Sequence, residues 1–339
     1  MDVTTDTVAR QEVVTALCRL GLLDSGETPP MTALRGGVSS DIWRVELPRG
    51  PVCVKRALPR LKVEAVWEAP VERNASECAW IETVAALYPD AVPQVIAHDA
   101  EAGLFVMSYL DPVDYPLWKR RLSEGDADTT FARRVGATLA GIHRATAGDT
   151  GLAARFSTDE FFYALRLEPY LVATGRRHPD LSADLQTLVT ATAGVKRALV
   201  HGDISPKNIL IGPRGPVFLD AECAWYGDPA FDLAFCLNHF LLKCLWTPHA
   251  AQRFLACFTA MAEVYLSAAD WEPTAELEAR VARLLPALFL ARVDGKSPVE
   301  YLTGECDKDR VRRVARPLIA AAPGRLESVR AAWAKEIGP

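Results

Sequence analysis

The sequence predicts an α+β protein of two lobes, a small lobe with an antiparallel sheet and a larger, mainly helical lobe. Three observations predict this fold class. The 339 residues are 50% hydrophobic and 24% charged, an ordinary globular composition, and the length favours about two domains. β-rich runs separated by turns fill much of the stretch between residues 31 and 110. Beyond Asp111-Pro112, apolar residues recur mostly at helical spacing.

The small lobe is expected to span residues 1–110. The turn-rich tetrapeptide Pro48-Arg49-Gly50-Pro51 separates two runs whose apolar residues recur near period two, which predicts an antiparallel hairpin. The other elements expected in this lobe are helices over 8–23 and 70–88 and strands over 92–97 and 104–110.

The larger lobe is expected to span residues 111–339. Most of it has the apolar spacing of helices, and one β-rich insert interrupts that pattern. The expected elements are helices over 129–147, 159–173 and 181–193, strands within 198–211 and 217–220, and helices after Asp232.

Charge and cysteine usage exclude several classes of protein. The formal net charge is −5, and a nucleic-acid-binding protein usually has a basic excess, so no nucleic-acid partner is expected. No apolar run approaches the roughly 18 residues of a membrane span, and the first ten residues do not open a secretory leader. The eight cysteines form no CxxC motif. The pattern is typical of reduced thiols in a cytoplasmic protein without zinc.

The segment 199–234 carries the chemistry. Four residues separate Asp203 from Asn208, and Asp220 closes a β-rich run twelve residues after Asn208. Transfer of a phosphoryl group needs an acid that accepts or orients a hydroxyl proton, and oxygen ligands that hold Mg²⁺. A carboxylate and an amide on one short loop, with an acid from the next strand, meet both needs. The alternative for the short Asp-x4-Asn motif alone is that these residues form turns and a helix cap.

The string HGDISPKN, followed by LDAE and GDPAFDLA, resembles the aminoglycoside phosphotransferase, choline kinase and methylthioribose kinase superfamily, over roughly residues 30–320. The resemblance implies a protein-kinase-like fold with ATP and Mg²⁺ as cofactors, a nucleotide-binding N-terminal lobe, and a catalytic and substrate-binding C-terminal lobe. It implies Asp203 as the catalytic base and Asn208 and Asp220 as Mg²⁺ ligands.

The resemblance also assigns supporting residues around this loop. It implies that His201 buttresses the loop, and that Asp228 and Asp232 fix the turn and helix that follow. A structural role for His201 is also favoured because Asp203 already fills the proton-transfer role. His143 is expected to be a satisfied, partly buried histidine without a chemical role.

A small-residue turn in the first lobe is a candidate phosphate-binding loop. Gly36, Gly37, Ser39 and Ser40 lie between two predicted strands, where backbone N–H groups can approach phosphates. An ordinary hairpin loop is the equally weighted alternative.

Lys55 stands in the β-rich run VCVKRAL, where a kinase keeps the lysine that contacts the α- and β-phosphates, and it is expected to face inward. The resemblance implies that a glutamate on the following helix holds this lysine. Glu77 is preferred and Glu72 is the alternative. The stretch FVMSYL resembles the adenine-binding hinge of the family, which makes Ser108 and Leu110 candidates for backbone contacts.

The short interval after Asp220 favours a small-molecule acceptor. Only seven residues separate Asp220 from Asp228, too few for the activation segment on which protein kinases seat a peptide. Lys207 is a candidate to neutralise charge on the transferring phosphoryl group, or is a solvated loop lysine. Glu222 is a candidate contact for the metal or the acceptor. A nucleotide-binding module without activity and a hydrolase with paired carboxylates remain alternative classes.

The class of acceptor is predicted from the end of the chain. Residues 233–339 hold 12 acidic and 14 basic residues, whereas a site for polycationic aminoglycosides should be acidic. The segment WYGDPAFDLAFCLNHFL is similar to the methylthioribose kinase form, in which a late basic stretch serves the sugar site. FLARVDGKSPVEYL takes that place here and offers Arg292, Asp294 and Lys296, with a solvated helix end as the alternative. Trp225 is a candidate acceptor contact, although core packing is favoured for most of the clustered aromatics.

The expected activity is therefore ATP-dependent phosphorylation of a hydroxyl group on a small neutral or weakly charged sugar or polyol. An aminoglycoside or another antibiotic is the second choice of acceptor, and a choline-like amino alcohol is the third.

Overall fold

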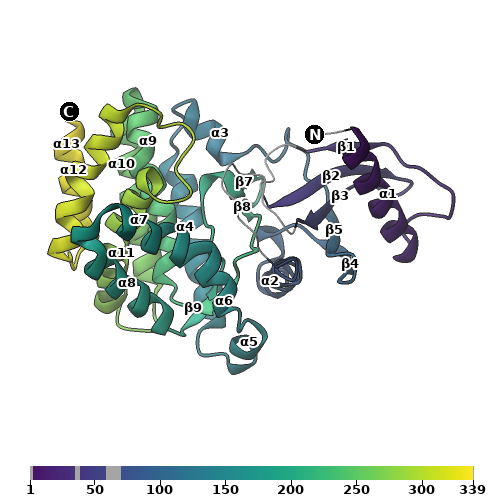
Figure 1. Cartoon of the computed structure of the whole chain (residues 1–339), viewed down its shortest axis with the longest axis horizontal. Coiled ribbons are helices and arrows are strands. Elements are labelled where there is room, and N and C mark those ends of the chain that lie inside the picture. The colour runs from purple at the N-terminus through teal and green to yellow at the C-terminus, as the bar shows by residue number, and fades with distance from the viewer. Residues whose placement is uncertain (1–2, 35–38, 59–69, 339) are drawn as a thin grey trace. The chain divides into compact units, whose positions relative to one another are not determined.

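The computed structural model describes residues 3–34, 39–58 and 70–338 (Figure 1). The chain divides into two compact units, Met1–Asp111 and Pro112–Pro339. The glycines of the candidate phosphate-binding loop, Gly36 and Gly37, lie outside the described residues.

The N-terminal unit is built on a five-stranded antiparallel sheet with the strand order β1-β2-β3-β5-β4. Its elements are α1 (Val3–Arg19), β1 (Met31–Ala33), β2 (Ser40–Leu47), β3 (Gly50–Ala57), α2 (Arg73–Leu87), the 3₁₀ turn η1 (Pro89–Ala91), β4 (Val95–Asp99) and β5 (Leu104–Ser108).

Strand β3 is buried on both faces, and alternate residues point to opposite faces of the sheet. Val52 and Val54 join a core cluster that includes Val13 and Leu17 of α1. Cys53 and Lys55 point to the opposite face, where Lys55 meets α2. The hairpin between β2 and β3 pairs Leu47 with Gly50, at the predicted turn.

The C-terminal unit is mostly helical (Figure 1). Its helices are α3 (Trp118–Ser123), α4 (Thr129–Thr146), α5 (Thr150–Arg155), α6 (Asp159–Phe162), the π-helix η2 (Tyr163–Val172), α7 (Ala173–Arg177), η3 (Pro179–Leu181), α8 (Ser182–Gly194), η4 (Pro206–Asn208), α9 (Ala230–Trp246), η5 (Pro248–Ala250), α10 (Ala251–Ala268), α11 (Thr274–Asp294), α12 (Glu305–Ala321) and α13 (Leu326–Ile337). Its short strands are β6 (Ala198–Val200), β7 (Ile209–Gly212), β8 (Gly215–Phe218) and β9 (Trp225–Gly227).

Helix α9 is the central helix of this unit and is buried over nearly its whole length. It packs against both α10 and α11, and α4 packs against α10. A helix that is apolar on all sides belongs in a core rather than at a surface. Any charged side chain on α9 is therefore held away from water.

The segment 159–173 is helical as expected, but it does not form one continuous α-helix. The chain there forms α6, the π-helix η2 and α7 in succession. Pro169 lies inside η2, and a proline removes one backbone donor and crowds the preceding turn. The wider π-turns carry the chain past this position, and such turns are often found at functional sites.

The β-rich insert also forms more and shorter strands than its pattern predicts. Strand β6 ends at Val200, a polar loop follows, and β7 begins at Ile209 and pairs with β8. Strand β9, which the sequence does not predict, pairs antiparallel with β6. The loop between β6 and β7 is thereby fixed at both of its ends.

The predicted α+β class is confirmed, with a five-stranded antiparallel sheet in the first unit and a mainly helical second unit. Among the described residues, none of the helices is both long and apolar enough to cross a bilayer.

The eight cysteines are all free thiols and all lie in described segments. Six are buried, Cys18 is half-buried and Cys306 is exposed. Burial raises the pKa of Cys53 to about 12, and it does the same for Cys244 and Cys257. These three buried thiols are therefore protonated and unreactive near neutral pH.

Candidate functional site

The loop from His201 to Asn208 connects β6 to β7 and carries most of the predicted catalytic residues. Asp232, near the start of α9, holds its first residues, because its carboxylate accepts the N–H groups of His201 and Gly202, each at 2.8 Å. Asp232 is fully buried. Besides the role at the following helix that the resemblance implies, Asp232 thus fixes the preceding loop.

His201 uses both ring nitrogens to hold backbone groups. Nδ1 accepts the N–H of Asp203 at 3.1 Å, so the proton lies on Nε2, which donates to the carbonyl of Leu219 at 3.1 Å. Burial lowers the pKa of His201 and keeps the ring neutral. These contacts support the structural role expected for His201 and link the loop to the residue before Asp220.

Gly202 is required by the backbone of this loop. Its φ of +80° lies in the left-handed region, and a Cβ atom would stand 2.7 Å from the carbonyl oxygen of Cys223. The close approach of the two backbones therefore sets the position of the next residue, Asp203.

Asp203 is buried and receives two cations. Arg166 Nη2 lies 2.9 Å and Lys207 Nζ 3.1 Å from Asp203 Oδ2. Burial alone would raise the pKa of Asp203, but Lys207 and Arg166 outweigh it and hold the pKa below its ordinary value. Asp203 is therefore a carboxylate at neutral pH, the form that accepts a hydrogen bond from a hydroxyl group.

Arg166, in the π-helix η2, is a site residue that the sequence analysis missed. Besides contacting Asp203, its guanidinium donates to the carbonyls of Gly202 and Leu165. It lies 37 residues before Asp203 in a segment that resembles an ordinary amphipathic helix. No local motif marks it, because only the fold of η2 brings it to the loop.

Asn208 and Asp220 offer the oxygen donors that Mg²⁺ prefers. The Asn208 side chain donates through Nδ2 to the carbonyl of Asp203 at 3.1 Å, which leaves Oδ1 as its acceptor atom. Its carbonyl accepts the N–H of Leu219 at 2.9 Å, so the two segments run side by side. Asp220 has a φ of +67°, an uncommon conformation for a residue with a side chain.

Within the described segments, no group of three or more His, Cys, Asp or Glu side chains forms a metal site. Asn208 and Asp220 together would supply two protein ligands, so further oxygen ligands from phosphates or water would be needed to complete a Mg²⁺ coordination sphere. The donor set fits an ion that arrives with a nucleotide.

In the N-terminal unit, Lys55 and Glu77 form a buried ion pair. Lys55 Nζ lies 2.7 Å from the Glu77 carboxylate, and the two side chains are 3% and 2% exposed. Glu72, the alternative partner, is an exposed residue at the start of α2 and makes no capping hydrogen bond. The preferred partner from the sequence is the one that the structure brings to Lys55.

Ser39 and Ser40, the last residues of the candidate phosphate-binding loop, are both buried. The carbonyl of Ser39 accepts hydrogen bonds from the Arg73 guanidinium at 2.6 Å and from the N–H of Leu58 at 2.9 Å. Arg73 is fully buried and also donates to the carbonyls of Pro70 and Leu58. It thus clamps the end of this segment, a role that the sequence analysis did not identify.

Ser108 ends β5 and makes two hydrogen bonds to Gln94, the residue before β4. Its N–H donates to the carbonyl of Gln94 at 2.8 Å, and its hydroxyl accepts the N–H of Gln94 at 3.0 Å. The amide of Ser108 is therefore committed to the sheet. Any backbone contact with adenine at this hinge falls to other groups, among them those of Leu110.

Two predicted acceptor contacts lie on the segment after Asp220. Glu222 is buried and acts electrostatically on Arg166. Trp225 is 1% exposed, stacks on Phe162 and donates its indole N–H to Asp159. The packing alternative fits Trp225 better.

The three residues from the late stretch are not brought together as one site. Asp294 is buried and pairs with Arg312 and His178, at 2.7 and 2.8 Å. Lys296 is half-exposed and pairs with Glu168 at 2.7 Å. Arg292 alone of the three points into a cavity that Lys207 also lines.

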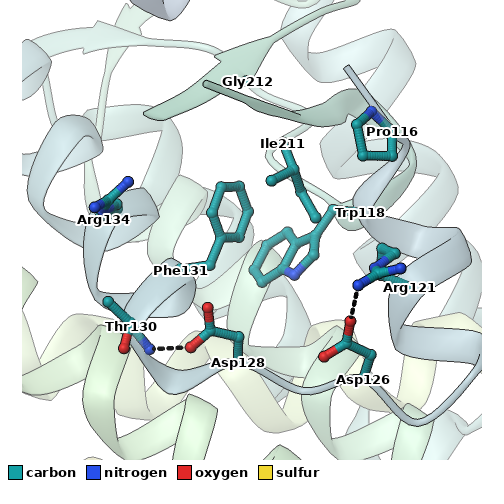
Figure 2. Close-up of a pocket in the computed structure, with 10 residues that line it drawn as sticks. All are labelled: Pro116, Trp118, Arg121, Asp126, Asp128, Thr130, Phe131, Arg134, Ile211 and Gly212. Carbon is teal, nitrogen blue, oxygen red and sulfur yellow. Dashed lines mark hydrogen bonds and ion pairs between the residues drawn. The ribbon is translucent and has the colours of Figure 1, made fainter. Parts of the chain in front are cut away.

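A larger groove of about 570 Å³ lies elsewhere on the C-terminal unit. Figure 2 shows Trp118, Phe131 and Ile211 at its centre, beside an ion pair of Arg121 with Asp126 at 2.5 Å. Asp128 caps α4 by accepting the N–H of Thr130. None of the predicted site residues lines this groove, so its size alone does not make it the functional site.

The sheet with its buried lysine–glutamate pair, and the helical unit with its polar loop, define the protein-kinase-like class of fold. The sequence profile described as "Phosphotransferase enzyme family" matches residues 30–277, well over half of the chain. The chain belongs to the phosphotransferase enzyme family.

Individual relatives are distant. A methylthioribose kinase from Pectobacterium carotovorum is 27% identical over 221 residues, which cover 57% of this chain and 54% of the relative. The chain thus spans about half the length of the curated relatives it matches.

Two solved structures share the fold. An amicoumacin kinase in complex with AMP-PNP, Ca²⁺ and Ami aligns over 95% of this chain and 97% of its own, with a TM-score of 0.56 and 15% identity. An ethanolamine kinase from Plasmodium vivax aligns over 98% and 91%, with a TM-score of 0.55 and 11% identity. The names of these proteins indicate very different acceptors, so the fold alone does not select one.

Proposed function

We propose that this protein transfers the γ-phosphoryl group of ATP to a hydroxyl group of a small sugar or polyol-like acceptor. The observation that carries the proposal is the state of Asp203, a buried carboxylate held by loop contacts and kept ionised by Arg166 and Lys207. Membership of the phosphotransferase family and the methylthioribose kinases among the curated relatives support it.

Asp203 accepts a hydrogen bond from the acceptor hydroxyl and orients its oxygen toward the phosphorus atom. This carboxylate has a low pKa, so it acts mainly by orientation and takes the proton late, as bonding to phosphorus develops. Lys207 stands beside it with a side chain that is 47% exposed, so its ammonium can turn from Asp203 to a phosphoryl oxygen.

Residues of both the early and the late motifs of the family hold the nucleotide. Lys55, oriented by Glu77, contacts the α- and β-phosphates, and backbone groups near Ser39 and Ser40 and at the Ser108–Leu110 hinge contact the rest. Asn208 and Asp220 would hold Mg²⁺, which when bound offsets the charge of the phosphates. Glu222 is retained as a candidate contact of the metal or the acceptor.

The test is the variant Asp203→Asn, which keeps the size of the side chain and removes its charge. We expect kcat to fall by roughly 10²–10⁴, the range for general acid–base groups, while MgATP still stabilises the protein against heat. Asp184→Asn, on the exposed face of α8, is the matched control and should keep full activity. Full turnover by Asp203→Asn with every acceptor would remove Asp203 from the mechanism.

The acceptor is found by measuring ATP consumption with sugars, sugar acids, polyols, amino alcohols and antibiotics. Turnover confined to polycationic antibiotics would reject the sugar or polyol class and keep the kinase activity.

A further inference from the structure

A small cationic cavity lies beside the catalytic loop and is not explained by the functions assigned so far. We call it the basic cavity. It has a volume of about 20 Å³, and the side chains that define it here are those of Lys119, Lys207, His239, Lys243, Arg292 and Tyr301. A single water requires roughly 10–15 Å³, so the cavity admits an oxygen-sized group as it stands.

The basic cavity adjoins the proposed base. Lys207 lines the cavity and also lies 3.1 Å from Asp203 Oδ2. Arg292 donates to the hydroxyl of Tyr170 at 3.0 Å, and the Tyr170 ring lies 5.9 Å from the guanidinium of Arg166, the second partner of Asp203. A small molecule with one end in the cavity can therefore present another end to Asp203.

Lys243 is the most unusual residue of the cavity. Its side chain is 1% exposed, and its ammonium lies 4.6 and 4.8 Å from the ring centres of Trp246 and Tyr301. In the segments that the structure describes, it forms no ion pair with a carboxylate. Glu300, the acidic residue at the cavity, is paired with Lys119.

Burial and the charge of Lys119 lower the pKa of Lys243 to about 7, against a smaller opposing effect of Glu300. The positive charge of Arg292 also lowers the pKa of Lys243. A lysine kept only for structure would have a carboxylate partner, since an unpaired buried charge costs stability.

Other polar groups of the cavity also lack partners within the described residues. Both ring nitrogens of His239, which is 5% exposed, make no hydrogen bond, and neither do Arg292 Nε and the hydroxyl of Tyr301. Buried polar groups are nearly always satisfied by protein or water. Their convergence on one cavity, together with an excess of cations, indicates a place prepared for an anionic group.

We propose that the basic cavity binds an anionic group of the acceptor, a carboxylate or a phosphate, so that the acceptor is a hydroxy compound with a negative charge. This proposal rests on the proposed kinase function and narrows its substrate class. The same cations repel an ammonium group, so amino alcohols and polycationic antibiotics are disfavoured as acceptors.

The first experiment compares matched acceptors with MgATP: glycerol, D-glycerate and glycerol 3-phosphate, then D-ribose, D-ribonate and D-ribose 5-phosphate. We expect a charged member of a series to have a kcat/KM at least tenfold above its neutral parent, and the better anion identifies the end group. A neutral parent that is used as well as its charged partners would overturn the proposal.

The second experiment measures binding without turnover, with D-glycerate and inorganic phosphate as probes in calorimetric titrations. Lys243→Met and His239→Phe keep the shape of the cavity and remove unpaired polar atoms, so both variants should fold. We expect each to weaken probe binding at least tenfold, whereas Lys308→Met, outside the cavity on α12, leaves it unchanged. Absence of saturable binding of both probes, or equal binding by Lys243→Met, would overturn the proposal.

The outcomes separate this proposal from the kinase function. Anion binding that depends on Lys243, without phosphoryl transfer to any acceptor, would reject the kinase function and keep the anion site. Phosphorylation of a neutral acceptor, at a rate that Lys243→Met does not change, would keep the kinase function and reject the anion site. A tenfold rise in the KM for ATP in Lys243→Met, with the acceptor KM unchanged, would assign the cavity to a nucleotide phosphate and overturn the proposal.

Discussion

At the scale of single residues, two buried lysines differ in how their charge is compensated. Lys55 has the carboxylate of Glu77 at 2.7 Å. Lys243 has two aromatic rings and, among the residues that the structure describes, no carboxylate partner. Because an isolated buried charge costs free energy, the first lysine depends on its partner for stability, whereas the second lowers stability where it stands.

The variant Lys55→Met should lower the free energy of unfolding by about 3–5 kcal/mol, because it removes the cation that lies 2.7 Å from the buried Glu77 carboxylate. The double variant Lys55→Met/Glu77→Leu removes both charges and should recover most of that loss. Neither variant should be stabilised by MgATP. Urea unfolding measures the stability and a thermal shift with MgATP measures the binding. Retention of a normal MgATP shift by the double variant would exclude Lys55 from nucleotide binding.

At the scale of elements, the loop between β6 and β7 depends on the close approach of two backbones. Gly202→Ala places a Cβ atom 2.7 Å from the Cys223 carbonyl at a φ of +80°, so it should destabilise the protein by about 1–3 kcal/mol. Gly194→Ala, at the open end of α8, is the matched control and should be neutral or stabilising by about 0.5 kcal/mol. Equal stability of the two variants in urea unfolding would contradict this account of Gly202.

The contiguous parts of the site could be predicted from the sequence, and the dispersed parts could not. Asp203 and Asn208 belong to one loop, so their spacing in the chain carried the prediction. Arg166 and Arg73 reach their targets only through the fold, and the π-helix that places Arg166 arises around Pro169, where the apolar spacing still predicts an α-helix. Strand β9 was missed because three residues are too short for a periodic signal.

The basic cavity did leave a signal in the sequence. His239 and Lys243 are four residues apart within CLNHFLLKCLW, so they share one face of an otherwise apolar helix. Polar groups at this spacing in such a helix are buried together, and that is a functional indication.

At the scale of the whole molecule, Lys243 should shape the dependence of stability on pH. Its folded pKa of about 7 lies below the roughly 10.4 of an exposed lysine, so between these values the unfolded chain binds more protons and stability rises with pH. Lys243→Met should therefore be more stable than the wild type at pH 7 and below.

That advantage should shrink toward zero by about pH 10, as the lysine loses its charge in both states. Thermal unfolding of both proteins across this range measures the difference. Lys308→Met, which removes a partly exposed lysine paired with Glu305, should show no such convergence. A constant difference between Lys243→Met and the wild type would mean that folding does not lower the pKa of Lys243.

The distribution of the cysteines leaves two thiols, one in each unit, accessible to labelling reagents. Cys18 belongs to the N-terminal unit and Cys306 to the C-terminal unit, and the other six thiols are buried. A thiol-directed fluorophore or spin label should therefore modify these two positions in the native chain without any engineered cysteine. The distance between the two labels, followed while MgATP is added, would report directly on any movement of one unit relative to the other.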